Sequence, residues 1–509
     1  MKKYWSLIIG VVWLAAGIVQ AAPLDPGLVA RIHFAGGDAV AADPNALPLR
    51  NLWSSPEGLA LRAQTLDKLS RFLDGWLRQA VAPNLVPAWQ TRPLLADLCL
   101  AEWQLEVRQP APGAVDFSLA VRLGENRAQA WQMALNPVLT GWKQSSPAHH
   151  GYVTVKDGWL FFALDNAPAP AAAGAIASLN HAWLTAEVDW ARLAVWFPAV
   201  AKFDIPQTRL EVTGKNGQFE ATGRLYLAQP LPPLQPWQVP TNIFHPPFLS
   251  FTAARGISDW LRQQPWAVTL GITPLPDQVF SWVLPQVPFL TFAAAPVANA
   301  PAALPKVANR VSDALLARSQ DENYRNVHIE STPNQILLVG LPLMAPFVEA
   351  RKEADGQFLV AGFLPVIPRG KPVPPELLAR LNQPNLVFYH WEITADRLAV
   401  FPQLYQLIFL VTGHCQLDDG TPGYNWLEHP GVKLGPTITT ATEVSPTELS
   451  FSRQAPAGLT ALELVALTSW LEGPDFPGGD LRVPPRKKIF NHHPHPPMTG
   501  APAPAVQHP

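Results

Sequence analysis

Residues Glu187–Phe197 read Glu-Val-Asp-Trp-Ala-Arg-Leu-Ala-Val-Trp-Phe, and residues Glu392–Phe401 repeat the pattern as Glu-Ile-Thr-Ala-Asp-Arg-Leu-Ala-Val-Phe. In both places an apolar run rich in β-branched and aromatic residues precedes the glutamate, and a proline follows the copy. This pattern is typical of a strand that leads into a helix. Recurrence at such long range predicts two similar lobes in series, and a chance match of about eleven residues is the alternative.

The order of the elements around the two copies also favours a duplication. Alternating polarity and an Asp-Gly turn predict a hairpin at 152–164, and a second hairpin is expected at 208–227. A hairpin at 437–453 follows the second copy as the hairpin at 208–227 follows the first. We therefore expect an α+β fold of two similar lobes in series, 22–229 and 302–477, each an antiparallel sheet with hairpins and packed helices.

Two helices have clear start signals. Ser55 and Pro56 form an N-cap and a first helical residue before a long apolar stripe, which predicts a helix that ends near Pro83. Thr460 and Glu463 form a capping box, which predicts a closing helix at 461–472 in the second lobe.

The stretch 230–301 differs from both lobes because prolines and large aromatic residues crowd it. We interpret it as a connector packed between the lobes, since a flexible linker does not carry so many apolar side chains. The alternative is an exposed surface that binds a ligand or a partner. The aromatic side chains that would form this surface are Trp237, Phe248, Trp282 and Phe289.

The two ends of the chain have their own character. Lys2 and Lys3 precede an apolar run, and small residues follow, so residues 1–21 are predicted to be a signal peptide cleaved after Ala21. A retained membrane anchor is the alternative, although the run is shorter than the roughly 20 residues that span a bilayer. We expect an exported protein, periplasmic or extracellular, without a transmembrane helix after cleavage. Residues 478–509 are rich in Pro, His, Gly and Ala and are predicted to be a disordered tail.

Charge and cysteine content exclude some classes of function. Loss of the signal peptide would leave 35 basic and 39 acidic side chains, because 37 basic and 39 acidic residues include Lys2 and Lys3. A near-neutral chain without a basic block is a poor binder of nucleic acid. The two cysteines, Cys99 and Cys415, could form one disulfide in an exported protein or remain free thiols.

Motifs of known catalytic sites are absent from the sequence, including Gly-x-Ser-x-Gly, His-Glu-x-x-His, the phosphate loop and Cys-x-x-Cys. The best catalytic candidates are His414, Cys415 and Asp418, in which histidine and a carboxylate could activate a thiol. Glycines and a proline surround them, so a polar loop explains the same residues. We expect no metal site and no cofactor.

The recurring stretch also carries a charged pair in each copy. We expect Glu187 with Arg192, and Glu392 with Arg397, to form structural ion pairs where the strand meets the helix. The sequence as a whole favours an exported, non-enzymatic binding or scaffolding protein of the cell envelope, whose target is an apolar ligand or a protein partner. An exported hydrolase with an unrecognised active site is the alternative.

Overall fold

The structure, a computed structural model, describes most of the chain between Gly27 and Pro477. The described residues are 27–80, 88–109, 115–145, 150–164, 182–196, 206–285, 290–316, 326–341, 344–354, 356–365, 371–401, 420–428, 434–473 and 476–477. These residues form 13 α-helices, one 3-10 helix and 18 strands, and every strand belongs to a single antiparallel sheet. The fold is therefore a mixed α+β fold, as the sequence predicts.

The first eight strands pair in the order β4–β5–β3–β2–β1–β6–β7–β8. Their bounds are β1 (Leu28–Phe34), β2 (Trp103–Arg108), β3 (Asp116–Arg122), β4 (Gly151–Lys156), β5 (Trp159–Leu164), β6 (Leu184–Val188), β7 (Gln207–Lys215) and β8 (Gln218–Tyr226). The predicted hairpins β4–β5 and β7–β8 are both present.

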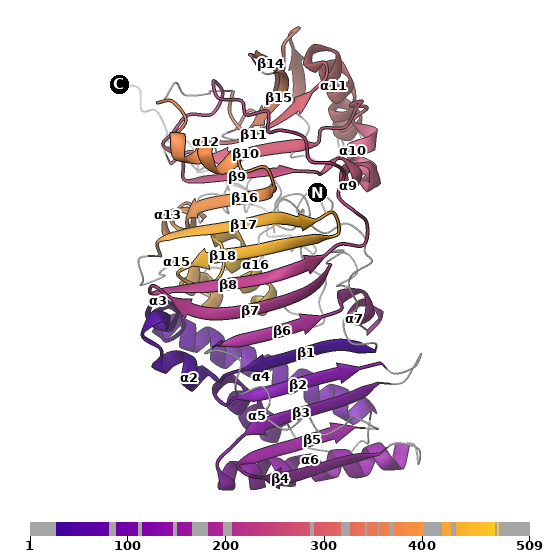
Figure 1. Cartoon of the computed structure of the whole chain (residues 1–509), viewed down its shortest axis with the longest axis vertical. Helices are drawn as coiled ribbons and strands as arrows, with labels where there is room; N and C mark the ends of the chain where they lie inside the picture. The colour runs from indigo at the N-terminus through magenta and orange to yellow at the C-terminus, as the bar shows by residue number, and fades with distance from the viewer. Residues whose placement is uncertain are drawn as a thin grey trace, which may run out of the picture.

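Strand β8 pairs with β18, and the sheet continues as β18–β17–β16–β9–β10–β11–β15–β14–β13–β12. The bounds are β9 (Ser250–Arg255), β10 (Gln278–Val283), β11 (Thr291–Val297), β12 (His328–Ser331), β13 (Gln335–Val339), β14 (Phe347–Glu353), β15 (Gly356–Gly362), β16 (Leu386–Ile393), β17 (Pro436–Ser445) and β18 (Glu448–Ala455). Figure 1 shows β8 and β18 side by side near the middle of this long sheet.

The order of strand pairing is the same on the two sides of the β8–β18 contact. Outward from β8 come β7, β6, β1, β2, β3, β5 and β4. Outward from β18 come β17, β16, β9, β10, β11, β15 and β14. The strands at matching positions of the two series also follow each other in the same order along the chain. Among the described strands, only the β12–β13 hairpin lacks a counterpart in the first half.

Most helices of the β1–β8 half lie on one face of the sheet, which we call the helix face, and Figure 1 shows them behind the strands. Leu210, Val212 and Ala221 pack there against residues of the short N-terminal helices. Helices α5 and α6 cover β3 and β5 on the same side. The helices are α2 (Gly37–Ala42), η1 (Pro44–Ala46), α3 (Leu47–Trp53), α4 (Pro56–Ala80), α5 (Ala88–Leu100), α6 (Glu125–Ser145) and α7 (Trp190–Trp196).

The helices of the other half lie at its edge and on both faces. They are α9 (Ser258–Gln263), α10 (Pro265–Thr269), α11 (Ala300–Leu316), α12 (Pro375–Leu381), α13 (Thr394–Ala399), α15 (Pro422–Glu428) and α16 (Ala461–Glu472). The predicted capping box of α16 is confirmed, since Thr460 accepts a hydrogen bond from the Glu463 N–H and the Glu463 side chain accepts one from the Thr460 N–H.

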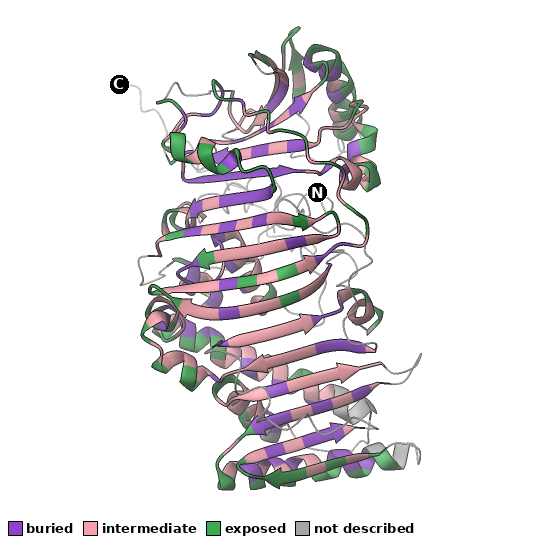
Figure 2. Ribbon diagram, in the orientation of Figure 1, coloured by how far each residue is buried: buried purple, intermediate pink, exposed green. Residues whose placement is uncertain are grey.

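The largest core lies on the opposite face from α16, around β9, β10 and β16. Residues of the segment 231–249, including Ile243 and Phe244, cover this part of the sheet together with α12. All six residues of β9 are buried because both of its faces are covered, as Figure 2 shows. The stretch 230–301 was predicted to be a packed connector, yet it contributes strands β9, β10 and β11 to the sheet.

Candidate functional site

One face of the first half, which we call the open face, carries a row of charged side chains and is not covered by the helices that the structure describes. Alternation along each strand puts Arg209 on this face, because its neighbours Leu210 and Val212 lie in the core of the helix face. Register then places Glu106, Arg31, Glu187, Arg209 and Arg224 opposite one another across five adjacent strands. We call this set, with its partners Arg108 and Glu448, the charge row.

Ion pairs link the members of the charge row across the strands. Arg31 lies 3.0 Å from Glu106 and 3.2 Å from Glu187, and Glu187 also lies 3.1 Å from Arg209. At the ends of the row, Arg108 pairs with Glu106, and Arg224 lies 3.2 Å from Glu448. The charges therefore alternate in sign from β2 to β7, with strands about 4.8 Å apart.

The charge row faces solvent rather than the core. The side chains of Arg209 and Arg224 are 48% and 44% exposed, while Glu187 between its arginines is 28% exposed. Figure 2 shows intermediate burial over most of β6 and β7, in contrast to the buried β9. Exposed ion pairs contribute little to stability, about 0–1 kcal/mol each. Their contribution to the stability of the fold therefore does not account for so regular a row.

The ion pairs expected within the recurring stretch are corrected by the structure in the first copy. Glu187 pairs with Arg31 and Arg209 from the neighbouring strands, and not with Arg192. Arg192 lies 3.3 Å from Asp189, whose carboxylate also accepts the Arg192 N–H at the start of α7. Glu187 faces away from this helix, because the strand alternates between the two faces of the sheet.

Glu392, the counterpart in the second copy, has a different environment. It lies on the helix face, with a side chain only 2% exposed, and accepts hydrogen bonds from the Thr394 hydroxyl at 3.0 Å and the Ala461 N–H at 2.7 Å. Burial would raise its pKa, but contact with His390, the charge of Arg397 and the Ala461 N–H outweigh burial and hold the pKa below its ordinary value. Glu392 thus ties β16 to the start of α16.

The imidazole of His390 lies between a hydroxyl group and a carboxylate. The Thr252 hydroxyl lies 2.8 Å from Nδ1 of His390, and Nε2 of His390 lies 3.5 Å from the Glu392 carboxylate. Nucleophilic hydrolases use the same order of groups. Here all three residues are buried on the helix face. We therefore assign the group a structural role in joining β9, β16 and α16.

The three residues of the proposed binding surface that the structure describes are at least partly buried. Trp282 is 1% exposed, and Trp237 and Phe248 are partly buried against the same core cluster. Phe289 lies outside the described residues. The positions that can be described favour the alternative that these side chains are core.

The catalytic candidates His414, Cys415 and Asp418 also lie outside the described residues. Cys99 is an exposed free thiol in the structure, and Cys415 lies outside the described residues. Within the described ranges no group of three His, Cys, Asp or Glu side chains is arranged to hold a metal ion. None of the helices that the structure describes is long and apolar enough to cross a membrane.

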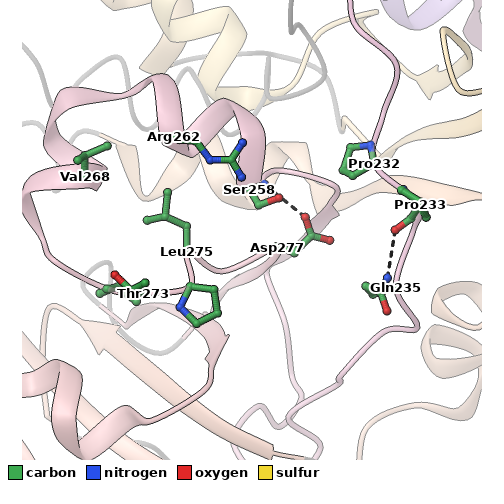
Figure 3. Close-up of a pocket in the computed structure, with 11 residues that line it drawn as sticks. Pro232, Pro233, Gln235, Ser258, Arg262, Val268, Thr273, Leu275 and Asp277 are labelled. Carbon is green, nitrogen blue, oxygen red and sulfur yellow. Dashed lines mark hydrogen bonds between the residues drawn. The ribbon is translucent and has the colours of Figure 1, made fainter.

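An open cleft of about 650 Å³ lies between α9, α10 and the segment that carries Pro233 and Gln235. Figure 3 shows Asp277 between Ser258 and this segment. Its carboxylate accepts backbone N–H groups of Gly256 at 3.2 Å and Ser258 at 3.3 Å. This carboxylate thus holds the turn that leads into α9.

Comparisons of the chain with protein-family models, with curated proteins and with solved structures find no match.

Proposed function

We propose that this protein is an exported, non-enzymatic binding protein that holds a protein partner against the open face of its sheet. The observation that supports this most is the charge row, a partly exposed row of alternating charges that none of the described helices covers. Complementary charges across an interface contribute specificity and association rate more than stability. A protein partner fits this face better than an apolar ligand does, because an apolar ligand needs an apolar lining.

We further propose that the chain consists of two similar units, β1–β8 and β9–β18, joined through the β8–β18 contact. The matching order of strand pairing supports this division, and so does the recurring stretch, which falls in β6 and β16. The second unit would then begin at β9 rather than after residue 301. Under this proposal, the duplication of one unit and the pairing of β8 with β18 produced the single long sheet.

The proposed export rests on the N-terminal segment. The exported protein should begin at Ala22 when its N-terminal residues are sequenced after purification from the periplasmic or extracellular fraction. Recovery only from the cytoplasmic fraction would contradict this part of the proposal.

A substitution in the centre of the open face tests the binding role. Thr222 is exposed on β8 and lies opposite Glu211 and Ser452, so Thr222→Trp places a large ring on the face without changing a charge. We expect this variant to lose the partner that co-purifies with the wild-type protein from the exported fraction. The matched control is Thr140→Trp on α6, an exposed threonine of the helix side. Equal recovery of the same partner by both variants would refute the assignment to the open face.

A further inference from the structure

The alternation of charges in the charge row breaks at one place, between β7 and β8. Arg209 and Arg224 are directly opposite each other in the register of these two strands. Like charges in this position oppose strand pairing. Every other neighbouring charged pair in this register row has opposite signs.

Each of the two guanidinium groups pairs with one glutamate and remains about half exposed. Nε of Arg209 lies 3.1 Å from Glu187, and Nη1 of Arg224 lies 3.2 Å from Glu448. Among the described residues, neither arginine forms an ion pair with a second carboxylate. Arg209 also lies over the ring of Tyr226, with 5.8 Å between its Cζ and the ring centroid. These contacts orient two half-exposed guanidinium forks toward the same side of the sheet.

We propose that Arg209 and Arg224 together bind one carboxylate of an acidic segment in the protein partner. A carboxylate between the two arginines would restore the alternation of signs, and the planar guanidinium fork matches a carboxylate with two parallel hydrogen bonds. This inference rests on the proposed function, because it names the chemistry by which the open face recognises its partner.

The local charge favours a carboxylate over a phosphate. The charge row contains four arginines and three glutamates, so one added negative charge neutralises it. Glu211 lies two residues from Arg209 on the same face, in register with Thr222, and its negative charge opposes a phosphate dianion more strongly than a singly charged carboxylate. A phosphate dianion would exceed the positive charge that is available there.

The test measures binding of a fluorescein-labelled hexaglutamate peptide to the mature protein by fluorescence anisotropy at low ionic strength. We expect binding to the wild type and a loss of affinity of about tenfold in each of Arg209→Gln and Arg224→Gln, as for removal of one charge-assisted fork. The charge-conserving variant Arg224→Lys should also bind more weakly, because lysine lacks the fork. The matched control is Arg310→Gln on α11, where an arginine that is 54% exposed pairs with Asp313 at 3.5 Å.

Several results would overturn the inference. They are no binding to the wild type, unchanged binding by both glutamine variants, an equal loss in the Arg310 control, or equal binding of a labelled hexalysine peptide. Displacement of the peptide by inorganic phosphate at a concentration where acetate has no effect would also overturn it. If hexaglutamate fails to bind while Thr222→Trp still loses the natural partner, the carboxylate site is wrong and the proposed function stands. If Thr222→Trp keeps its partner, the proposed function itself fails.

Discussion

The two glutamates of the recurring stretch should have very different effects on stability when each is replaced by alanine. Both come from the same sequence pattern, but Glu392 is buried on the helix face and Glu187 lies on the open face. We expect Glu392→Ala to lower the free energy of unfolding by about 3 kcal/mol. This follows from about 1–3 kcal/mol for the Ala461 N–H left without an acceptor, and from the loss of the negative charge beside Arg397.

The replacement of Glu187 should cost less than about 1 kcal/mol. Its partners Arg31 and Arg209 are 36% and 48% exposed, so water replaces the lost contacts readily. Urea unfolding of the two variants, followed by tryptophan fluorescence under identical conditions, measures the difference directly. Equal shifts of the unfolding midpoint, or a larger shift for Glu187→Ala, would refute the assignment of the two glutamates to opposite faces.

Three further predictions follow from buried groups. Because the pKa of Glu392 is lowered in the folded state, its carboxylate stabilises the fold at neutral pH, and this contribution is lost as the pH falls through the lowered value. Below pH 4.5, the unfolding midpoint of Glu392→Gln should therefore fall less steeply with pH than that of the wild-type protein. Arg255 is buried and donates to the carbonyls of Leu386 at 2.7 Å and Gln235 at 2.8 Å, so Arg255→Ala should lower the thermal midpoint, with an unfolding cost of about 3 kcal/mol, whereas an unchanged midpoint would contradict its role. Trp282→Ser should destabilise by about 3–5 kcal/mol in calorimetry; a variant that stays folded and loses only partner binding would restore the surface interpretation.

Local signals in the sequence predicted the elements that depend on local chemistry. The Asp157-Gly158 turn has φ angles of 52° and 78°, and the Asn216-Gly217 turn has 53° and 69°, as two-residue hairpin turns require. The capping box at Thr460 likewise needs only residues three positions apart. These features are encoded within a few residues, so one sequence is sufficient to find them.

Strand β9 was missed because its pattern is not that of a half-buried strand. Both faces of β9 are covered, so its sequence lacks the alternation of polar and apolar residues that is typical of a strand with one buried face. The prolines around it suggested a connector instead. A strand of this kind is recognised only when the elements that cover both faces are known.

The ion pairs of the charge row could not be predicted from the sequence. Which strands neighbour β2 depends on long-range pairing, so the match of Glu106 with Arg31 and of Glu187 with Arg209 could not be read from spacing. The pairing of Glu187 with Arg192 was predicted from proximity along the chain, but the register of the sheet places Glu187 beside arginines of the neighbouring strands.

Site-specific photo-crosslinking in living cells tests whether the open face holds a partner. A benzoylphenylalanine residue is placed at Thr222 on the open face and, in a matched strain, at Thr140 on α6. We predict that irradiation yields a discrete adduct with one protein from Thr222 and none of that adduct from Thr140. The account would be contradicted if the Thr222 probe gave no adduct, or if both positions gave the same one.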